Sequence, residues 1–412
     1  MGLKGYIILI YLVLAAIRFV LQLVRYRSAG NPIPKNVSDV YDQETYLKWQ
    51  RYHGEQGRLE MVNLLVSTAV MTVLLLTDAH VVFAKLFGSS PIGTMIAVVL
   101  CQSLVDFVCS LPFAYMDTMH IEEKYGFNRS TMKTFVRDQI IGLVMELAVS
   151  LLIVLAMCGS HRLLGDGMVV LFGAVMCLFV LVLNLLAPLL TRIQNKFTPL
   201  EEGSLRDKLT ALLTNHGYTV KAIEVMDASR RTSKSNAFFS GFGRQKRIVL
   251  FDTLLETMEE DEICAVFAHE LGHGLHRDIP KLLAMNCGNM VLTAVLAWFA
   301  VRFESLHQAF GFDEVNYGFA YLLLGTVALP LVMQLVGMAI NAVSRKAEYA
   351  ADAQAVEEGY GEALISGLKK LSRGNFAHLS PSKLLVVLEY SHPPLSERIA
   401  AIESVTKSET KQ

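Results

Sequence analysis

Long apolar stretches alternate with polar segments along the chain, and seven of these stretches have about the 20 residues needed to cross a bilayer. The first could be mistaken for a signal peptide. However, it has only Lys4 ahead of it, no small-residue cleavage pattern and Arg18 near its end, so we expect a retained helix. The recurrence of such runs favours membrane spans over large buried core helices. The predicted spans are residues 5–24, 61–84, 93–115, 139–158, 168–191, 281–301 and 317–340.

Lys and Arg residues follow the same alternation. They concentrate in the first, third and fifth connections between spans, whereas the other connections contain little more than Lys85, Arg162 and Arg302. The positive-inside rule therefore puts the N-terminus outside and the C-terminus in the cytoplasm, and an odd number of spans requires the same result. Most polar residues then lie on the cytoplasmic side, in segments 25–60, 116–138, 192–280 and 341–412.

The two longest polar segments predict a small mixed domain that two spans interrupt. Residues 205–216 favour a short amphipathic helix, YTVKAIEVMD a strand, and SNAFFSGFGRQKRIVLFD a β-hairpin. A helix is expected on TLLETMEEDEICAVFAHELGHGLHRD. The tail predicts an Ala-rich helix, a loop around SRGNFAHLSPSK and a Pro-led helix on SHPPLSERIAAIESV. We divide the chain into residues 1–191 with five spans, 192–280 with the first part of this domain, 281–340 with two spans, and 341–412 with its second part.

The overall composition agrees with a membrane protein. Hydrophobic residues make up 53% and charged residues 18%, where soluble domains have about a quarter charged residues. The mean hydropathy is +0.40. A net charge of −1 gives no electrostatic footprint for nucleic acid. The six cysteines lack CxxC spacing, which argues against a disulfide framework and a cysteine zinc site.

Several predicted spans carry polar groups, among them Asp106 in the third, Glu146 in the fourth and Asn184 in the fifth. Ionisable groups at membrane depth usually face a bundle interior or a water-filled cavity. Buried structural hydrogen bonds would explain them equally well. If they face water, the bundle is hollow.

The sequence HELGH, His269 to His273, predicts a metal site. Residues i and i+4 share one face of a helix, so both imidazoles can reach one zinc ion while Glu270 lies beside it as a general base. A catalytic zinc needs a third protein ligand. The metzincin position for that ligand is Ile279 here, and His276 would lie about 10 Å along the helix from His269, too far for one tetrahedral ion.

The stretch SRKAEYAADAQAV offers the missing ligand. Glu348 follows the last predicted span and lies on the same membrane side as HELGH, so we expect it to be the third zinc ligand. Asp352, one turn later, can accept a hydrogen bond from a ligand imidazole. A solvated acidic helix face is the alternative, which the companion HELGH motif makes less attractive.

These residues resemble the gluzincin arrangement of the M48 peptidases, and more narrowly the Ste24-type CAAX prenyl proteases. The likeness includes the seven spans, IEEKYGFNRST, SNAFFSGFG and SHPPLSERI, although Phe238 stands where Ste24 proteins usually have Tyr. It implies an all-α membrane bundle of seven transmembrane helices, hollow and barrel-like, carrying a small α+β zinc metalloprotease domain. Asp106 and Glu146 would suit that wet interior.

The resemblance also implies roles for individual residues. His269, His273 and Glu348 would bind one zinc ion per chain, Glu270 would be the catalytic base and Asp352 would orient an imidazole. His392 would donate to the oxyanion. Residues of an edge strand would pair with substrate backbone, and a basic residue would hold that region or a substrate carboxylate; the substrate-binding residues implied are Asn236, Ala237, Phe238 and Arg398.

We therefore expect an integral membrane zinc endopeptidase that removes the C-terminal tripeptide of prenylated CAAX proteins. One alternative is a bacterial quality-control protease without a prenyl requirement, and another is a seven-span transporter or receptor with a non-catalytic zinc site. The expected partners are a peptide or protein substrate and the lipid bilayer, without nucleic acid, and the expected state is a monomer. The active site would face the cytoplasm from a bacterial inner membrane, or from the endoplasmic reticulum or inner nuclear membrane of a eukaryote.

Overall fold

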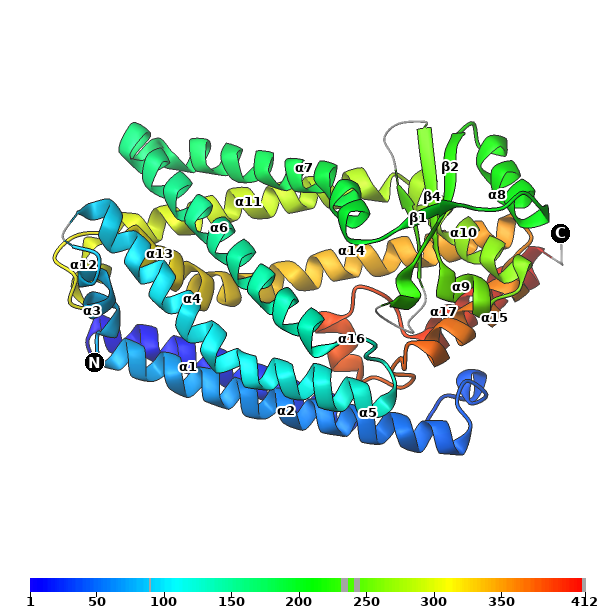
Figure 1. Ribbon diagram of the computed structural model, residues 1–412, viewed down its shortest axis with the longest axis horizontal. Coiled ribbons are helices and arrows are strands. Elements are labelled where there is room, and N and C mark those ends of the chain that lie inside the picture. The colour runs from blue at the N-terminus through cyan, green and yellow to red at the C-terminus, as the bar shows by residue number, and fades with distance from the viewer. Residues whose placement is uncertain (89, 231–235, 241–244, 410–412) are drawn as a thin grey trace.

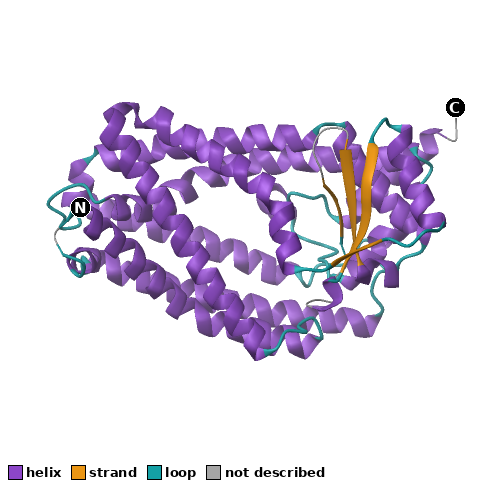
Figure 2. Cartoon of the chain, turned by 45° about the horizontal axis from the view of Figure 1, so that its top comes forward, coloured by secondary structure: helices purple, strands orange, loops and turns teal. Residues whose placement is uncertain are grey.

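The computed structural model describes residues 1–412 except 89, 231–235, 241–244 and 410–412. Long helices run along the longest axis of the molecule, with the N-terminus at one end and a small sheet at the other (Figure 1). Viewed from a second direction, the sheet again lies beside helices at that end (Figure 2). The molecule is therefore a mostly helical membrane bundle with a compact polar end.

Each of the seven predicted spans falls largely on a long helical stretch. Among the described residues, six helical stretches are long and apolar enough to cross a membrane. One of them, Met132–Leu186, contains two helices separated by the 3-10 turn Gly165–Gly167. The last span contains a π-helical segment, Leu324–Ala328, between α13 (Tyr317–Leu323) and α14 (Leu329–Glu357). The membrane helices are α1 (Leu3–Ser28), α2 (Gln43–Leu76), α4 (Pro91–Met116), α6 (Met132–Leu164), α7 (Met168–Gln194), α11 (Asp278–Arg302), α13 (Tyr317–Leu323) and α14 (Leu329–Glu357).

Shorter elements connect these helices and build the polar end. The π-helical segment Asp117–Glu122 extends α4 toward that end, and two 3-10 turns, Lys35–Val37 and Ala228–Arg230, lie in connections. The short helices are α3 (Ala79–Lys85), α5 (Glu123–Tyr125), α8 (Ser204–Asn215), α9 (Asp252–Thr257), α10 (Glu260–Leu275), α12 (Glu304–Gln308), α15 (Gly361–Gly374), α16 (Lys383–Glu389) and α17 (Leu395–Glu409).

Two predicted boundaries were wrong. The second span was expected at 61–84, but α2 begins at Gln43 and ends at Leu76. Asp78 then has a left-handed backbone, with φ 55°, which turns the chain into α3. Likewise, the helix expected from TLLETM to HRD is divided into α9 and α10, because Met258 is extended and Glu259 starts a new capped helix.

The sheet has four strands in the order β1-β2-β4-β3. They are β1 (Phe197–Pro199), β2 (Thr219–Met226), β3 (Ala237–Ser240) and β4 (Gln245–Phe251). β2 and β4 pair in parallel, while β1 with β2 and β3 with β4 are antiparallel. The predicted strand and hairpin are thus confirmed, and β3 is an edge strand. The hairpin turn lies outside the described residues.

The predicted polar segments meet at one end of the bundle. Trp49 donates to the carbonyl of Phe376, Tyr52 donates to Glu122, and Asn36 donates to the carbonyl of Ser396. These contacts join the first and third connections to the C-terminal tail around a shared aromatic core. At the opposite end, Lys4 pairs with Asp78 over 2.7 Å.

Candidate metal centre

Helix α10 packs against other elements on two sides, the sheet on one and α14 on another, and this packing holds the metal motif in place. Its buried residues Ile263, Phe267 and Leu271 pack on the sheet with Ile248 and Leu250. A capping box between Glu259 and Glu262 satisfies the first free backbone N–H groups. His269 and His273 then project from the side that faces α14, as their i, i+4 spacing predicts.

Small residues let α10 and α14 approach closely at this point. A Cβ added to Gly272 would lie 2.8 Å from the Cα of Ala351 and 3.0 Å from the Cβ of Gln354. Only glycine fits that contact without moving a helix backbone. The close approach brings Glu348 and Asp352, both buried, against the two histidines.

The three expected zinc ligands converge. One donor atom from each of His269, His273 and Glu348 lies within 4.8 Å of the others. The Nε2 atoms of His269 and His273 lie 3.5 Å and 3.4 Å from the two oxygens of Glu348. Zinc bonds of about 2.0–2.1 Å at tetrahedral angles separate ligand atoms by about 3.3 Å. The spacing therefore suits a shared ion better than direct hydrogen bonds.

The buried carboxylate of Glu348 supplies a second indication. Its Oε2 atom is buried and has no hydrogen-bond partner in the part of the chain that is described. An orphaned buried oxygen of this kind costs free energy unless an ion or water satisfies it. Together with the two converging Nε2 atoms, it fits a zinc ion in both donor type and geometry.

Each of the two histidines contacts a carboxylate through its Nδ1 atom, which points away from the other ligands. Asp352 Oδ1 lies 2.9 Å from Nδ1 of His269, as the sequence predicted for one of the two. Asp278 Oδ2 lies 3.1 Å from Nδ1 of His273, a contact that the sequence analysis missed. A proton on each Nδ1 leaves each Nε2 lone pair free for the metal. The signal for Asp278 was its position five residues after His273.

Arg398 is engaged within the site. Its Nε and Nη2 atoms donate to the two oxygens of Asp352 over 2.9 Å and 2.6 Å. Its Nη1 lies 3.4 Å from Oε2 of Glu348. The side chain is only 11% exposed. This geometry supports a role in holding the acids, rather than in binding a substrate carboxylate.

His392 lies beside the three ligands but faces the cleft. Its Nε2 is 3.2 Å from Oε1 of Glu348, and its side chain is 65% exposed. The segment before it is fixed by Arg345, which donates to the carbonyls of Val386 and Tyr390 over 2.9 Å and 2.6 Å. Arg345 lies on α14 one turn before Glu348, so one helix positions both groups. This role of Arg345 has no signal in the sequence, because it depends on contacts with a separate segment.

A cleft of about 600 Å³ joins the metal group to the edge strand. Asn236 and Ala237 line it, together with Glu270 and the three ligands. The carbonyl of Asn236 accepts from Phe251 of β4, so the backbone of Ala237 faces the free edge. The Phe238 side chain instead packs toward Met226, Ala228 and Val249, so only its backbone is available to a substrate. The remaining wall mixes apolar and polar side chains, and it comes from α15, the loop after it and the segment that leads into α17.

Burial also changes the chemistry of Glu270. Its removal from water raises the pKa of the carboxyl, and the charge of Glu348 adds to this, while His269, His273 and Arg398 oppose it. A carboxylate with a raised pKa is a better proton acceptor. His276, by contrast, is exposed at the end of α10 and lies outside the metal group, as expected.

Comparison with known proteins agrees with this geometry. Residues 199–406 match the model of peptidase family M48, and residues 22–192 match that described as CAAX prenyl protease N-terminal, five membrane helices. The chain is 32% identical over 393 residues to the CAAX prenyl protease 1 homolog of Arabidopsis thaliana, with 91% of each protein covered. It is 28% identical to CAAX prenyl protease 1 of Saccharomyces cerevisiae, covering 91% of this chain and 89% of that protein.

The chain belongs to peptidase family M48. The crystal structure of S. mikatae Ste24p superposes on it with a TM-score of 0.87 at 26% identity, over 98% of this chain and 99% of that one. The predicted resemblance to Ste24-type M48 proteases is thus confirmed, and so is the fold. An M48 zinc metallopeptidase with several membrane helices replaces the transporter or receptor alternative.

Proposed function

We propose that this M48 peptidase cleaves prenylated CAAX-type proteins near their C-termini, with the active site on the cytoplasmic side of the membrane. The observation that carries the proposal is the cleft itself, in which an edge strand faces a converging His, His and Glu group. The relatives named as CAAX prenyl proteases support the substrate class. The Lys- and Arg-rich connections at the same end support the orientation.

The residues present fit a zinc ion at His269, His273 and Glu348. Zinc bound there supplies a Lewis acid that polarises a carbonyl and acidifies water. Asp352 and Asp278 hold the two imidazoles with their Nε2 atoms turned inward. This fixed arrangement limits the reorganisation that the site needs during the reaction.

The edge strand and two side chains provide the remaining chemistry. Substrate backbone adds to the free edge at Ala237 in an extended conformation. Glu270 takes a proton from the attacking water, whose oxygen bonds to the carbonyl carbon. Glu270 then gives that proton to the leaving amine as the C–N bond breaks. His392, exposed to the cleft, donates to the oxyanion that develops on the carbonyl oxygen.

The first test compares two peptides of identical CAAX sequence, one farnesylated and one not, cleaved by the purified protein in lipid nanodiscs. We expect kcat/KM to be at least about tenfold higher for the farnesylated peptide, because burial of its apolar chain stabilises the bound state. Mass spectrometry identifies the cleaved bond. Glu270→Gln is the control and should retain zinc but lose cleavage.

Equal rates for the two peptides would overturn the prenyl requirement and favour the quality-control alternative. Unchanged turnover by Glu270→Gln would overturn the proposed catalytic base.

A further inference from the structure

The wall of the metal cleft includes a loop that carries none of the three expected metal ligands. This loop (residues 375–380) follows α15, and its residues Asn375, Ala377 and His378 line the cleft. Its backbone is unusual at Phe376, which has a left-handed φ of 49°. An aromatic residue rarely adopts this conformation, which persists only where the surrounding contacts impose it. Those contacts therefore set the shape of this part of the cleft.

One group of contacts comes from α2. The carbonyl oxygen of Phe376 accepts hydrogen bonds from Nε1 of Trp49 and from Nε2 of His53, each over 3.0 Å. Trp49 is only 1% exposed, and its ring packs edge-on against the ring of His378 with centroids 5.0 Å apart. Trp49 and Phe376, which are 327 positions apart in the sequence, thus meet to fix the loop.

His378 ties the same loop to the first membrane helix. Its Nδ1 accepts a hydrogen bond from the backbone N–H of Ser380 over 3.2 Å, so the ring proton lies on Nε2. Nε2 donates over 2.8 Å to Oγ of Ser28, the last residue of α1, whose hydroxyl donates in turn to the carbonyl of Arg25. Burial, with the positive charges of His53 and Arg25, lowers the pKa of His378 to about 4. The ring is therefore neutral near pH 7, and neither nitrogen is left for acid–base chemistry.

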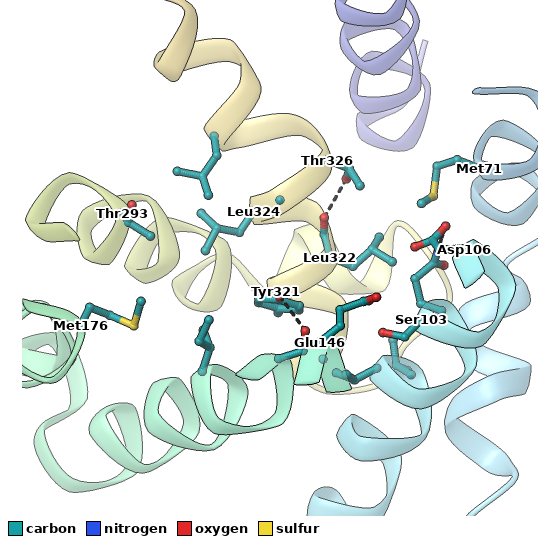
Figure 3. A pocket seen from close by; sticks show the side chains of 18 of the residues that line it. Met71, Ser103, Asp106, Glu146, Met176, Thr293, Tyr321, Leu322, Leu324 and Thr326 are labelled. Carbon is teal, nitrogen blue, oxygen red and sulfur yellow. Dashed lines mark hydrogen bonds between the residues drawn. The ribbon is translucent and has the colours of Figure 1, made fainter. Parts of the chain in front are cut away.

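The three anchors of this loop, Trp49, Ser28 and His378, are separate from the metal group and from the interior of the bundle. None of them is among the converging ligands. Asp106 and Glu146 line another cavity, of about 380 Å³, which lies among the membrane helices (Figure 3), and none of the anchors lines it. A change at an anchor should therefore alter the cleft wall and leave the metal group and that cavity as they are.

We propose that Trp49, Ser28 and His378 are positioning residues for substrate binding, which hold the loop of residues 375–380 in the form that a substrate contacts in the cleft. Through them, the membrane helices α1 and α2 contribute to the substrate site. This inference rests on the proposed peptidase function, because it concerns the same cleft. The metal ligands have no part in it, so the affinity for substrate should change while the chemical step does not.

The experiment measures the binding of a fluorescent farnesylated CAAX peptide to the full chain in lipid nanodiscs, on a Glu270→Gln background that does not cleave it. Trp49→Phe keeps an aromatic ring but removes the N–H donor. We expect Kd to rise roughly 3- to 10-fold, the range that the loss of one hydrogen bond implies. Trp298→Phe, at the other of the two tryptophans, is the matched control, because that indole donates over 3.0 Å to Asp166 outside the cleft. An unchanged Kd in Trp49→Phe would overturn the proposal.

Ser28→Ala tests the second anchor from outside the cleft, because Ser28 is buried and does not line it. It removes the oxygen that accepts from His378 and should also raise Kd roughly 3- to 10-fold. Ser38→Ala is its matched control, since the Ser38 hydroxyl likewise donates to a carbonyl three residues earlier, that of Lys35 in the first connection. Equal Kd values for Ser28→Ala and Ser38→Ala would contradict the role of His378 as an anchor.

The same substitutions with Glu270 intact separate positioning from general damage. Both Trp49→Phe and Ser28→Ala should raise KM for the peptide and keep kcat within about twofold, with the zinc content of the wild type. Loss of zinc, or a fall in kcat as large as the rise in KM, would identify a merely structural role and overturn the proposal. If the wild type binds the peptide with this pattern of Kd values but does not cleave it, the proposed peptidase function alone is overturned.

Discussion

At the scale of single residues, the candidate metal site depends on the carboxylate that contacts the Nδ1 atom of each histidine. His269 has Asp352 on its outer nitrogen, and Asp352 is fixed in turn by Arg398. His273 has Asp278, which also contacts Lys281 over 3.1 Å. Arg277, with a left-handed φ of 57°, turns the chain between α10 and α11 and so brings Asp278 back to His273. The first residue of a membrane helix thereby orients His273 within the candidate metal site.

Asp278→Asn should weaken zinc binding roughly 10- to 100-fold, because an amide holds the imidazole less firmly than a carboxylate. A competition titration with a chelator measures the affinity directly. Lys281→Gln removes the exposed partner of the same carboxylate and should have little effect. Zinc affinity equal to that of the wild type in Asp278→Asn would contradict this positioning role.

At the scale of elements, the site depends on how α10 packs between its neighbours. Gly272 allows α14 to approach on one side. On another side, Glu262 joins α10 to α15 through Ser366 at 2.6 Å and Lys370 at 2.7 Å. Neither Gly272 nor Glu262 belongs to the metal group, yet both set the position of the helix that carries HELGH.

Gly272→Ala should force α10 and α14 apart, because its new methyl group would lie 2.8 Å from the Ala351 backbone. Overpacking of this kind costs about 1–3 kcal/mol. We expect a lower melting temperature together with weaker zinc binding, both measured on purified protein. Gly274→Ala, two residues further along the same helix, is the comparison substitution. A fully stable variant with normal zinc affinity would refute the close-packing argument.

Glu262→Gln tests the second contact through its pH dependence. Burial alone would raise the pKa of Glu262, but Lys370, Ser366 and the Glu259 backbone N–H outweigh it, so the pKa is lowered. A lowered folded-state pKa contributes stability above the unfolded value, about 4.3, that is lost as pH falls through the folded value. The free energy of unfolding of the wild type should therefore be roughly 1.5–3 kcal/mol higher than that of the variant near pH 7.

That difference should shrink as the pH falls below the unfolded value and disappear only below the lowered folded-state pKa of Glu262, where its carboxyl group is neutral. Thermal unfolding across the pH range measures it. Glu260→Gln, on the exposed side of the same helix, should show a smaller difference. A constant gap between wild type and Glu262→Gln at all pH values would contradict the ion pair as its cause.

At the scale of the whole molecule, the polar segments and the metal centre share one end of the bundle, and the N-terminus lies at the other (Figure 1). Lys4 with Asp78, and Arg302 with Asp166, mark that opposite end. From the Lys and Arg pattern we propose that the metal end faces the cytoplasm.

Cysteine labelling tests this orientation in sealed cells. A membrane-impermeant maleimide should modify Glu304→Cys from outside and Lys407→Cys only after lysis, on a background without the native cysteines. Labelling of Lys407→Cys in intact cells would reverse the assigned orientation.

Much of this organisation could be predicted from the sequence, because apolar length and helical spacing are local signals. The apolar spans and the HELGH helix are of that kind, whereas Glu348 and Asp352 became candidates only because HELGH lies on the same side of the membrane. Asp278 and Arg345 could not be found in this way, because their roles depend on how the chain turns and on contacts between separate elements. The break after Leu76 depends on a single left-handed residue, Asp78.

The most direct test of the account is the zinc content of purified protein, measured by mass spectrometry for the wild type and two variants. We expect about one zinc per chain in the wild type and in Glu270→Gln, and a large loss in Glu348→Ala, because three protein ligands hold a catalytic zinc. Full zinc occupancy in Glu348→Ala would contradict the three-ligand site on which the proposed peptidase mechanism rests.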